Sequence, residues 1–404
     1  MLANFRSLSL PALCGPALID GLGLPRYWAA VWASFQPADL APSTLSKKLS
    51  HLESFYQHAE ESLGPGGLDD ALASFDVDAL SSALEGFYLA IRNRPPITPA
   101  SEERWQAALQ FVTGILQRLT RNSLPLEQLD ALSGKLMRHE LLNSHLHVGT
   151  ARRPERIRSL PSEVVEFLYE TLDPECPANP FRGAASRWRV YTIFILLLHQ
   201  GLRRSELLNF PADVIKSSFD RGLQQERFWM TVRYNDYEDD PRYSTPRIKN
   251  ANSIRQLPVS QPIALFVQEY LSNYRGRVDH SFLINSQKRK PMSARELNKI
   301  FQKIAASLPL DLRRILQDHT GENSITPHDL RHTCAVVRLN QLLSSGMEMT
   351  DALERMRVFF GWSRDSDMPL RYARAVFEDR LASVWNSKFD DRVEVLRNLP
   401  ERLK

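Results

Sequence analysis

The chain has 404 residues, enough for two or three domains of roughly 100–200 residues each. Its 43% hydrophobic and 24% charged residues are typical of a soluble globular protein, while the net charge of +4 says little about its partners. Three cysteines without a Cys-x-x-Cys pair exclude a disulfide framework and a thiolate zinc site, which fits a reducing, cytoplasmic compartment.

No segment of the sequence is expected to cross a membrane. The longest apolar run, residues 190–198, is far shorter than the roughly 20 residues that a membrane-spanning helix needs. Prolines and glycines interrupt the apolar N-terminus, so it is typical of an irregular leader rather than a signal peptide. We therefore expect residues 1–40 to be irregular, apart from one short helix near residues 27–35.

Residues 41–147 carry the pattern of a small helical domain. Apolar residues recur at helical spacing in four stretches, at residues 45–56, 80–88, 105–116 and 129–141. Glycines and prolines at 64–67 and prolines at 95–96 separate the first three stretches. The following residues 148–160 are basic and lack apolar periodicity, which is typical of a linker between domains.

The rest of the chain, residues 161–404, is predicted to be helical for most of its length. Residues 188–200 are strongly apolar and are followed by Gly201, which predicts a buried helix that ends at a glycine. Residues 227–258 contain alternating apolar and polar side chains on either side of a polar stretch at 234–252, so two or three strands fit there. The sequence therefore predicts a mainly α fold with a small antiparallel β-sheet, of the α+β class.

The charges are distributed unevenly along the chain. Residues 1–150 carry 11 Lys and Arg against 15 Asp and Glu, whereas residues 151–404 carry 40 against 32. The C-terminal part is therefore the better electrostatic partner for a polyanion. A solvated surface with a mild basic bias explains the same numbers.

Four clusters of polar residues stand out in this C-terminal part. They are residues 201–207 (GLRRSEL), the strand connection around Lys249, residues 328–333 (HDLRHT), and Gly361-Trp362 ten residues before Tyr372. Taken singly, each has an ordinary explanation, such as a surface arginine, a solvated loop lysine or a half-buried tyrosine. His328 and His332 are spaced like two metal ligands on one helix face, but no glutamate lies between them and no third ligand is evident.

Together, in this order and at this spacing, the clusters resemble the tyrosine recombinase (phage integrase) family over about residues 155–385. The resemblance implies that Arg203 is the first catalytic arginine, with Arg204 as its rival and Glu206 as a structural acid beside it. His332 is expected to have a structural place near the same site. The remaining catalytic positions implied by the family are Lys249, His328, Arg331, Trp362 and the nucleophile Tyr372.

These residue types suit the breaking and rejoining of a phosphodiester. A free phenolate costs roughly 4 kcal/mol at pH 7, and a cationic pocket lowers that cost. The two arginines are suited to hold the charged phosphate through bidentate hydrogen bonds. Lys249 is suited to protonate the leaving 5′ oxygen, and His328 to contact the phosphate or exchange a proton with Tyr372. The indole of Trp362 is suited to donate a hydrogen bond to the phosphate and to pack the pocket.

The resemblance also implies a site-specific DNA recombinase or integrase that acts through a 3′-phosphotyrosyl intermediate and a Holliday junction, in the integration or excision of a mobile element. Because the covalent intermediate keeps the energy of the broken bond, no metal and no nucleotide cofactor are expected. Residues 41–147 correspond to the family's core-binding domain, which clamps DNA, and residues 161–404 to the catalytic domain. Its C-terminal helical tail is expected to dock on a neighbouring protomer of a homotetramer.

The implied partners are double-stranded DNA with a specific attachment site and an accessory directionality protein, in a cytoplasmic, nucleoid-associated setting. Two alternatives stay open, a DNA relaxing enzyme of the type IB topoisomerase kind and a non-catalytic DNA-binding protein on a recombinase scaffold. Contacts with DNA phosphates position a protein without reading sequence, although a run of charge is also what a solvated face presents. The basic residues expected to make such contacts are Lys47, Lys48, Arg152, Arg153, Lys288, Arg289, Lys290 and Arg295.

Overall fold

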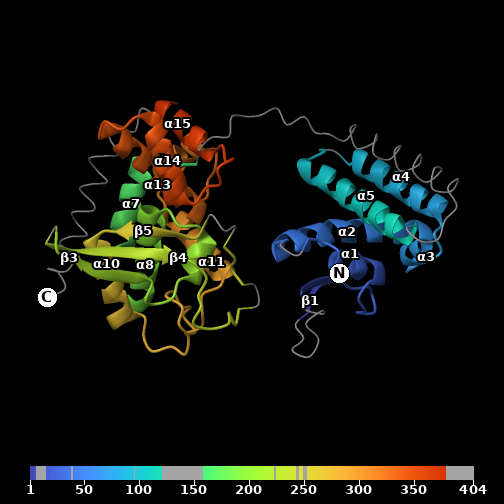
Figure 1. Ribbon diagram of the computed structural model, residues 1–404, viewed down its shortest axis with the longest axis horizontal. Helices are drawn as coiled ribbons and strands as arrows, with labels where there is room; N and C mark the ends of the chain where they lie inside the picture. The colour runs from blue at the N-terminus through green and yellow to red at the C-terminus, as the bar shows by residue number, and fades with distance from the viewer. Residues whose placement is uncertain are drawn as a thin grey trace. The chain divides into compact units, whose positions relative to one another are not determined.

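The computed structural model describes residues 1–5, 15–37, 40–94, 96–120, 158–222, 224–242, 245–248 and 253–378. The chain divides into two compact units, Met1–Arg152 and Arg153–Lys404, and both are drawn in Figure 1. The division falls within the basic stretch 148–160. None of the helices in the described ranges is both long and apolar enough to cross a membrane.

The first unit begins with a short β-hairpin that the sequence analysis did not anticipate. Strands β1 (Leu2–Phe5) and β2 (Gly15–Leu18) pair antiparallel, and Leu2 lies opposite Leu18. The prediction that residues 1–40 are irregular apart from one helix is therefore wrong for the hairpin. Leu18 is buried in the core of the unit. Strands of four residues are too short for an alternating pattern to stand out in the sequence.

Five helices follow in the described part of this unit. They are α1 (Tyr27–Ser34), α2 (Pro42–Leu63), α3 (Gly67–Ala73), α4 (Val77–Arg92) and α5 (Pro99–Thr120). Proline in the first turn starts α2, and the carboxylate of Asp76 caps α4 by accepting a hydrogen bond from the Ala79 N–H at 2.9 Å. The helices predicted near residues 27–35, 45–56, 80–88 and 105–116 are confirmed. The one predicted at 129–141 lies outside the described residues.

The second unit combines helices with one three-stranded sheet. Its strands are β3 (Ile215–Asp220), β4 (Gln225–Val232) and β5 (Arg255–Val259). Its helical elements are α7 (Ser162–Leu172), α8 (Ala184–Gln200), α9 (Arg204–Asn209), α10 (Gln261–Glu269), a π-helical turn (Tyr270–Tyr274), α11 (Ala294–Ser307), α12 (Leu310–Thr320), α13 (Pro327–Ser344), α14 (Met349–Phe360) and α15 (Met368–Glu378). The predicted mainly α fold with a small antiparallel sheet is confirmed.

The sheet has the strand order β3-β4-β5 and is antiparallel throughout, with Met230 of β4 opposite Leu257 of β5. Strand β5 alternates between buried and exposed positions, and its buried side chains are Arg255, Leu257 and Val259. Two of these three are apolar and join the core, as the alternation predicts. The third is an arginine, and a buried charge of this kind needs a partner.

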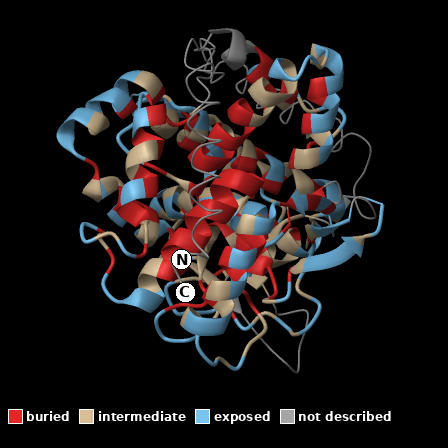
Figure 2. Cartoon of the chain, turned by 90° about the vertical axis from the view of Figure 1, so that its left-hand side faces the viewer, coloured by how far each residue is buried: buried red, intermediate tan, exposed pale blue. Residues whose placement is uncertain are grey.

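Helix α8 is buried at every position from Trp188 to Gln200, which is typical of a helix surrounded by protein. It contacts α13, which in turn contacts α14 and α15. In Figure 1 these last three helices, drawn in orange to red, gather at one end of the unit. Figure 2 shows buried residues filling the middle of the view and exposed residues at its edge.

Helix α8 ends at Gly201, and this position requires glycine. Its φ of +57° is left-handed, where other residues are strained. A Cβ atom at Gly201 would lie 2.3 Å from Cε1 of Phe360 at the end of α14. Gly201 thus lets α8 stop against α14, and the chain turns directly into Arg203 and α9.

Candidate active site

The first part of the site forms where α8 passes into α9. Arg203 occupies the position before the first turn of α9, and Glu206 lies in that turn. The Arg203 N–H donates to Glu206 Oε2 at 2.8 Å, and the Arg203 guanidinium Nη1 donates to Glu206 Oε1 at 2.7 Å. The neighbouring Arg204 points elsewhere, because its Nη1 donates to Asn298 on α11 at 3.0 Å. The geometry therefore favours Arg203 over its rival.

Glu206 lies at the centre of three guanidinium groups. Besides Arg203, Arg255 donates from Nη1 to Oε1 and from Nη2 to Oε2, both at 3.0 Å. Arg331 Nη1 lies 3.9 Å from Oε2. Burial raises the pKa of Glu206, but the hydrogen bonds and charge of Arg255 and the charges of Arg331 and Arg203 outweigh it and lower the pKa to about 2. Glu206 is therefore a permanent anion that ties three arginines together.

Arg255 is a residue of the site that the sequence analysis missed. It lies on the buried face of β5, and its Nε donates to the Phe359 carbonyl at 2.6 Å while Nη1 donates to the Ser253 carbonyl at 2.8 Å. These bonds join β5, α9 and the end of α14. The signal that was present is the alternation of β5, which puts an arginine on the same face as Leu257 and Val259.

Arg331 projects from α13 into the same cluster and is almost completely buried. Its Nη1 donates to the Gly201 carbonyl at 2.5 Å and its Nη2 donates to the Phe360 carbonyl at 2.6 Å. Burial and the charge of Arg203, opposed by Glu206, lower the pKa of Arg331 to about 9, which leaves the guanidinium charged at neutral pH. The side chain thereby holds the end of α8 and the end of α14 together.

Tyr372 lies on α15 with 1% of its surface exposed. Its hydroxyl oxygen and Nδ1 of His332 on α13 are 2.5 Å apart, within hydrogen-bond distance. Burial raises the pKa of Tyr372, and the charges of Arg331 and Arg203 oppose that rise. The phenol is therefore neutral in this state, although it lies within the field of two arginines.

A stack of aromatic rings packs against one face of the Tyr372 ring. The Trp362 ring lies 5.3 Å from the Tyr372 ring and 4.9 Å from the Phe360 ring, and both pairs are stacked at about 15°. The guanidinium carbon of Arg331 lies 4.9 Å from the centre of the Phe360 ring. In this arrangement Trp362 packs against Tyr372, which is compatible with the packing role predicted for it.

The two histidines of α13 lie against each other. The His328 and His332 rings are 4.3 Å apart and meet edge to face, with His328 exposed and His332 half-buried. The site thus brings together residues from helices α9, α13 and α15 and from the turns that follow α8 and α14, namely Arg203, Glu206, His328, Arg331, His332, Trp362 and Tyr372. Within the described ranges, no group of three metal-ligating side chains is present.

The other predicted residues belong to the first unit, to other elements of the second unit, or to ranges that are not described. Lys249, Arg152 and Arg153 lie outside the described residues. On α2 of the first unit, Lys47 pairs with Glu103 at 2.6 Å, and Lys48 donates to Gln36 at 3.1 Å. The four basic residues predicted in the second unit lie in a turn and at the start of α11, and all four are exposed: Lys288, Arg289, Lys290 and Arg295.

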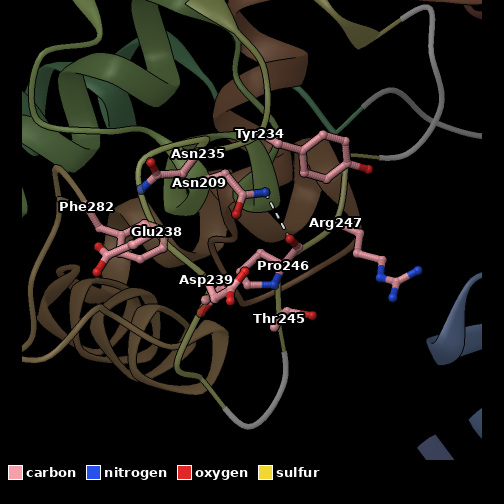
Figure 3. Close-up of a pocket in the computed structure, with 10 residues that line it drawn as sticks. Asn209, Tyr234, Asn235, Glu238, Asp239, Thr245, Pro246, Arg247 and Phe282 are labelled. Carbon is pink, nitrogen blue, oxygen red and sulfur yellow. Dashed lines mark hydrogen bonds between the residues drawn. The ribbon is translucent and has the colours of Figure 1, made fainter. Parts of the chain in front are cut away.

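A cavity of about 390 Å³ lies along the connection between β4 and β5. Figure 3 shows the Asn209 side chain directed at the Pro246 carbonyl, to which it donates at 2.9 Å. Three carboxylates line the cavity, and two of them are engaged in bonds: Glu238 accepts from Ser281, and Asp240 accepts from Arg242. Such an acidic lining disfavours a phosphate. The hydrogen bonds around the cavity instead hold the described part of the connection between β4 and β5 in place.

One family model matches the part of the chain that contains this cluster. Residues 158–378 match the family model of the phage integrase family. Two similar solved structures are the XerA recombinase and the XerH site-specific recombinase bound to a palindromic difH substrate in a post-cleavage complex. XerA is 15% identical with a TM-score of 0.30, over 88% of this chain and 97% of that one. XerH is 14% identical with a TM-score of 0.37, over 88% and 93%.

No curated protein sequence matches the chain. The family assignment rests on the family model, which covers more than half of the 404 residues and contains every member of the arginine and tyrosine cluster. The chain belongs to the phage integrase family, the tyrosine recombinases, which break and rejoin DNA.

Proposed function

We propose that this protein is a site-specific recombinase that integrates or excises a mobile element by attacking a DNA phosphodiester with Tyr372. The observation that carries the proposal is the placement of one tyrosine hydroxyl in the field of two arginines that share the buried carboxylate of Glu206. Attack by the tyrosine joins its oxygen to phosphorus as a 3′-phosphotyrosyl ester and releases a 5′ hydroxyl. Religation reverses the step without a nucleotide cofactor, because the ester keeps the energy of the broken bond.

Arg203 is the arginine best placed to meet the phosphate first. Its side chain is 18% exposed, compared with 2% for Arg331. The donors of Arg331 are engaged by the carbonyls of Gly201 and Phe360, and Tyr372 is buried. DNA binding is therefore proposed to uncover Arg331 and Tyr372, so that the phosphate accepts hydrogen bonds from Arg203 and from further N–H groups of Arg331.

Lys249 is proposed as the group that protonates the leaving 5′ oxygen. Ser253 follows it by four residues, and its hydroxyl accepts a hydrogen bond from Arg203 Nη1 at 3.1 Å. Four residues of extended chain reach at most about 14 Å. This short separation along the chain permits Lys249 to approach the Arg203 cluster.

The remaining elements of the proposal concern assembly. Double-stranded DNA with a specific attachment site is the substrate, bound by the first unit as a core-binding domain and by the exposed basic residues of the second. A homotetramer on two duplexes, coupled through C-terminal tails and directed by an accessory protein, completes the reaction. Exposed lysines and arginines at 288–290 and at Arg295 support a phosphate-binding role for that surface.

A covalent trapping experiment tests the proposal. A pool of duplexes with a randomised central segment is first enriched by repeated selection for binding to the full-length protein. The selected duplexes are then nicked, so that the fragment with the released 5′ hydroxyl is lost after cleavage and cannot religate. The reaction is stopped with detergent and run beside Tyr372→Phe. We expect a covalent protein–DNA band that is absent in Tyr372→Phe. A band that persists in the variant would identify a different nucleophile, and tight binding without any band would indicate a non-catalytic DNA-binding protein.

A further inference from the structure

His332 is the histidine that the structure brings to the hydroxyl of Tyr372. Its Nδ1 lies 2.5 Å from the tyrosine oxygen, and the two rings are 5.7 Å apart at 45°. The resemblance to the family directs attention to His328, four residues earlier on the same helix. His328 is exposed and stacks edge to face on His332, on the solvent side of it.

We propose that His332 accepts the phenolic proton of Tyr372 as the tyrosine attacks the phosphodiester. The inference rests on the proposed function and deepens it, because it names a catalytic residue that contacts the reacting oxygen. A general base must lie within hydrogen-bond reach of the proton that it removes, and the His332–Tyr372 pair already meets that requirement in the absence of DNA.

His332 is neutral in this state, as a proton acceptor must be. Burial, with contributions from the charges of His328 and Arg331, lowers the pKa of His332 to about 3. The imidazole is therefore neutral at physiological pH and has one nitrogen with a free lone pair. With a phenol as the donor, that nitrogen is Nδ1, and the ring proton is on Nε2.

The backbone around His332 is held firmly. Its neighbour Arg331 is tied to Gly201 and Phe360, and its other neighbour Thr333 accepts a hydrogen bond from the Leu160 N–H at 2.8 Å. Thr333 also donates to the Asp329 carbonyl at 2.8 Å. His332 is thus fixed next to the arginine proposed to bind the phosphate, so the proton acceptor and the phosphate are held by one turn of α13.

The proton balance of the step is complete. The Tyr372 oxygen forms a bond to phosphorus, the bond from phosphorus to the 5′ oxygen breaks, and the tyrosine proton moves to His332 Nδ1. The leaving 5′ oxygen takes a proton from a separate donor, for which Lys249 is proposed. Because the tyrosine oxygen loses its affinity for the proton as it bonds to phosphorus, an acceptor much weaker than a phenolate suffices. The negative phosphate offsets the new charge on the imidazolium. Religation runs the same transfers backward.

Paired substitutions separate proton transfer from hydrogen bonding. His332→Asn places an acceptor oxygen where Nδ1 stands but cannot take up a proton, and His332→Ala removes both functions. We expect both variants to slow single-turnover cleavage of the selected nicked duplex by about 100-fold or more. His319→Asn on α12 is the matched control and is expected to react at the wild-type rate.

Three outcomes would overturn the inference. A rate for His332→Asn close to wild type would reduce the role of His332 to hydrogen bonding. Faster cleavage by His332→Ala would show that the hydrogen bond between His332 and Tyr372 restrains the tyrosine. Recovery of His332→Asn on a duplex with a bridging 5′ sulfur, whose thiolate leaves without protonation, would place His332 at the leaving group. In each case wild-type trapping persists, whereas failure of the proposed function abolishes trapping in the wild-type protein.

A measurement on the native chain does not depend on the folding of a variant at 332. In full-length protein with ¹⁵N-labelled histidine, NMR is expected to show His332 with unprotonated Nδ1 and protonated Nε2 at neutral pH. Tyr372→Phe, which removes the donor, is expected to shift the Nδ1 resonance of His332 and to leave that of His319 unchanged. A protonated Nδ1 in the native protein would overturn the inference.

Discussion

Glu206 and Arg255 form a two-point ion pair inside the second unit, with each guanidinium nitrogen 3.0 Å from a different carboxylate oxygen. The pair is buried and also supports Arg203, whose guanidinium shares the Oε1 atom of Glu206. Neither residue of the pair is proposed to touch DNA. Their geometry instead sets the position of Arg203, which is proposed to contact the DNA phosphate.

Glu206→Gln is expected to lower both stability and activity. Breaking a buried ion pair leaves an uncompensated charge, here on Arg255, at a typical cost of about 3–5 kcal/mol. Urea unfolding of the full chain measures the change in the free energy of unfolding. Glu226→Gln on the exposed face of β4 is the matched control and is expected to change it by less than about 0.5 kcal/mol. A loss of similar size in both variants would contradict the central role of Glu206.

The stability of the protein is expected to fall at acidic pH through Glu206. Its carboxyl has a folded pKa of about 2 against an ordinary value of 4.5, so its contribution is complete above pH 4.5 and is lost as the pH falls toward 2. His199 and His332 add to the loss below about pH 6.5, because burial keeps both neutral in the folded state. Free energies of unfolding from pH 7 to pH 3 measure the decline. In Glu206→Gln the loss of unfolding free energy below pH 4.5 should be smaller than in the wild-type protein. Equal losses in the two proteins would refute the low pKa of Glu206.

Gly201→Ala is expected to destabilise the site much more than Gly321→Ala. Both glycines have a left-handed φ, which costs an alanine roughly 1–2 kcal/mol. A Cβ at Gly201 would meet Phe360 at 2.3 Å, whereas at Gly321 it would meet nothing within 4 Å. Overpacking adds about 1–3 kcal/mol at Gly201 alone. Thermal unfolding compares the two variants, and equal losses would mean that the ends of α8 and α14 are not tightly packed.

Trp362→Phe and Trp362→Ala distinguish packing from hydrogen bonding. A phenyl ring can keep the stack between Phe360 and Tyr372. Alanine leaves a cavity that lowers the free energy of unfolding by about 3–5 kcal/mol. We expect Trp362→Phe to trap DNA within about tenfold of the wild-type rate and Trp362→Ala to trap it far more slowly. If the indole N–H binds the phosphate in the transition state, Trp362→Phe will instead lose roughly 100-fold or more.

Most members of the cluster around Arg203, Arg331 and Tyr372 could be singled out in the sequence because they belong to short local patterns. The segments around Arg203 and Arg331 each contain several distinctive residues within one or two helical turns, and the order of these segments and Tyr372 along the chain is that of the family. Helices with long apolar stripes were equally visible. The roles of these residues and the boundaries of the domains stay predictions, and Lys249 lies outside the described residues.

The sequence by itself determined the fold class, the family and which arginines and tyrosine to consider. Tertiary structure alone decided that Arg255 of β5 holds Glu206 and that His332 faces Tyr372. The physical reason is distance along the chain: 49 residues separate Arg255 from Glu206, and 40 separate His332 from Tyr372. Local periodicity indicates which side chains are buried, but only the packing of β5 next to α9 and of α13 against α15 decides which buried groups meet.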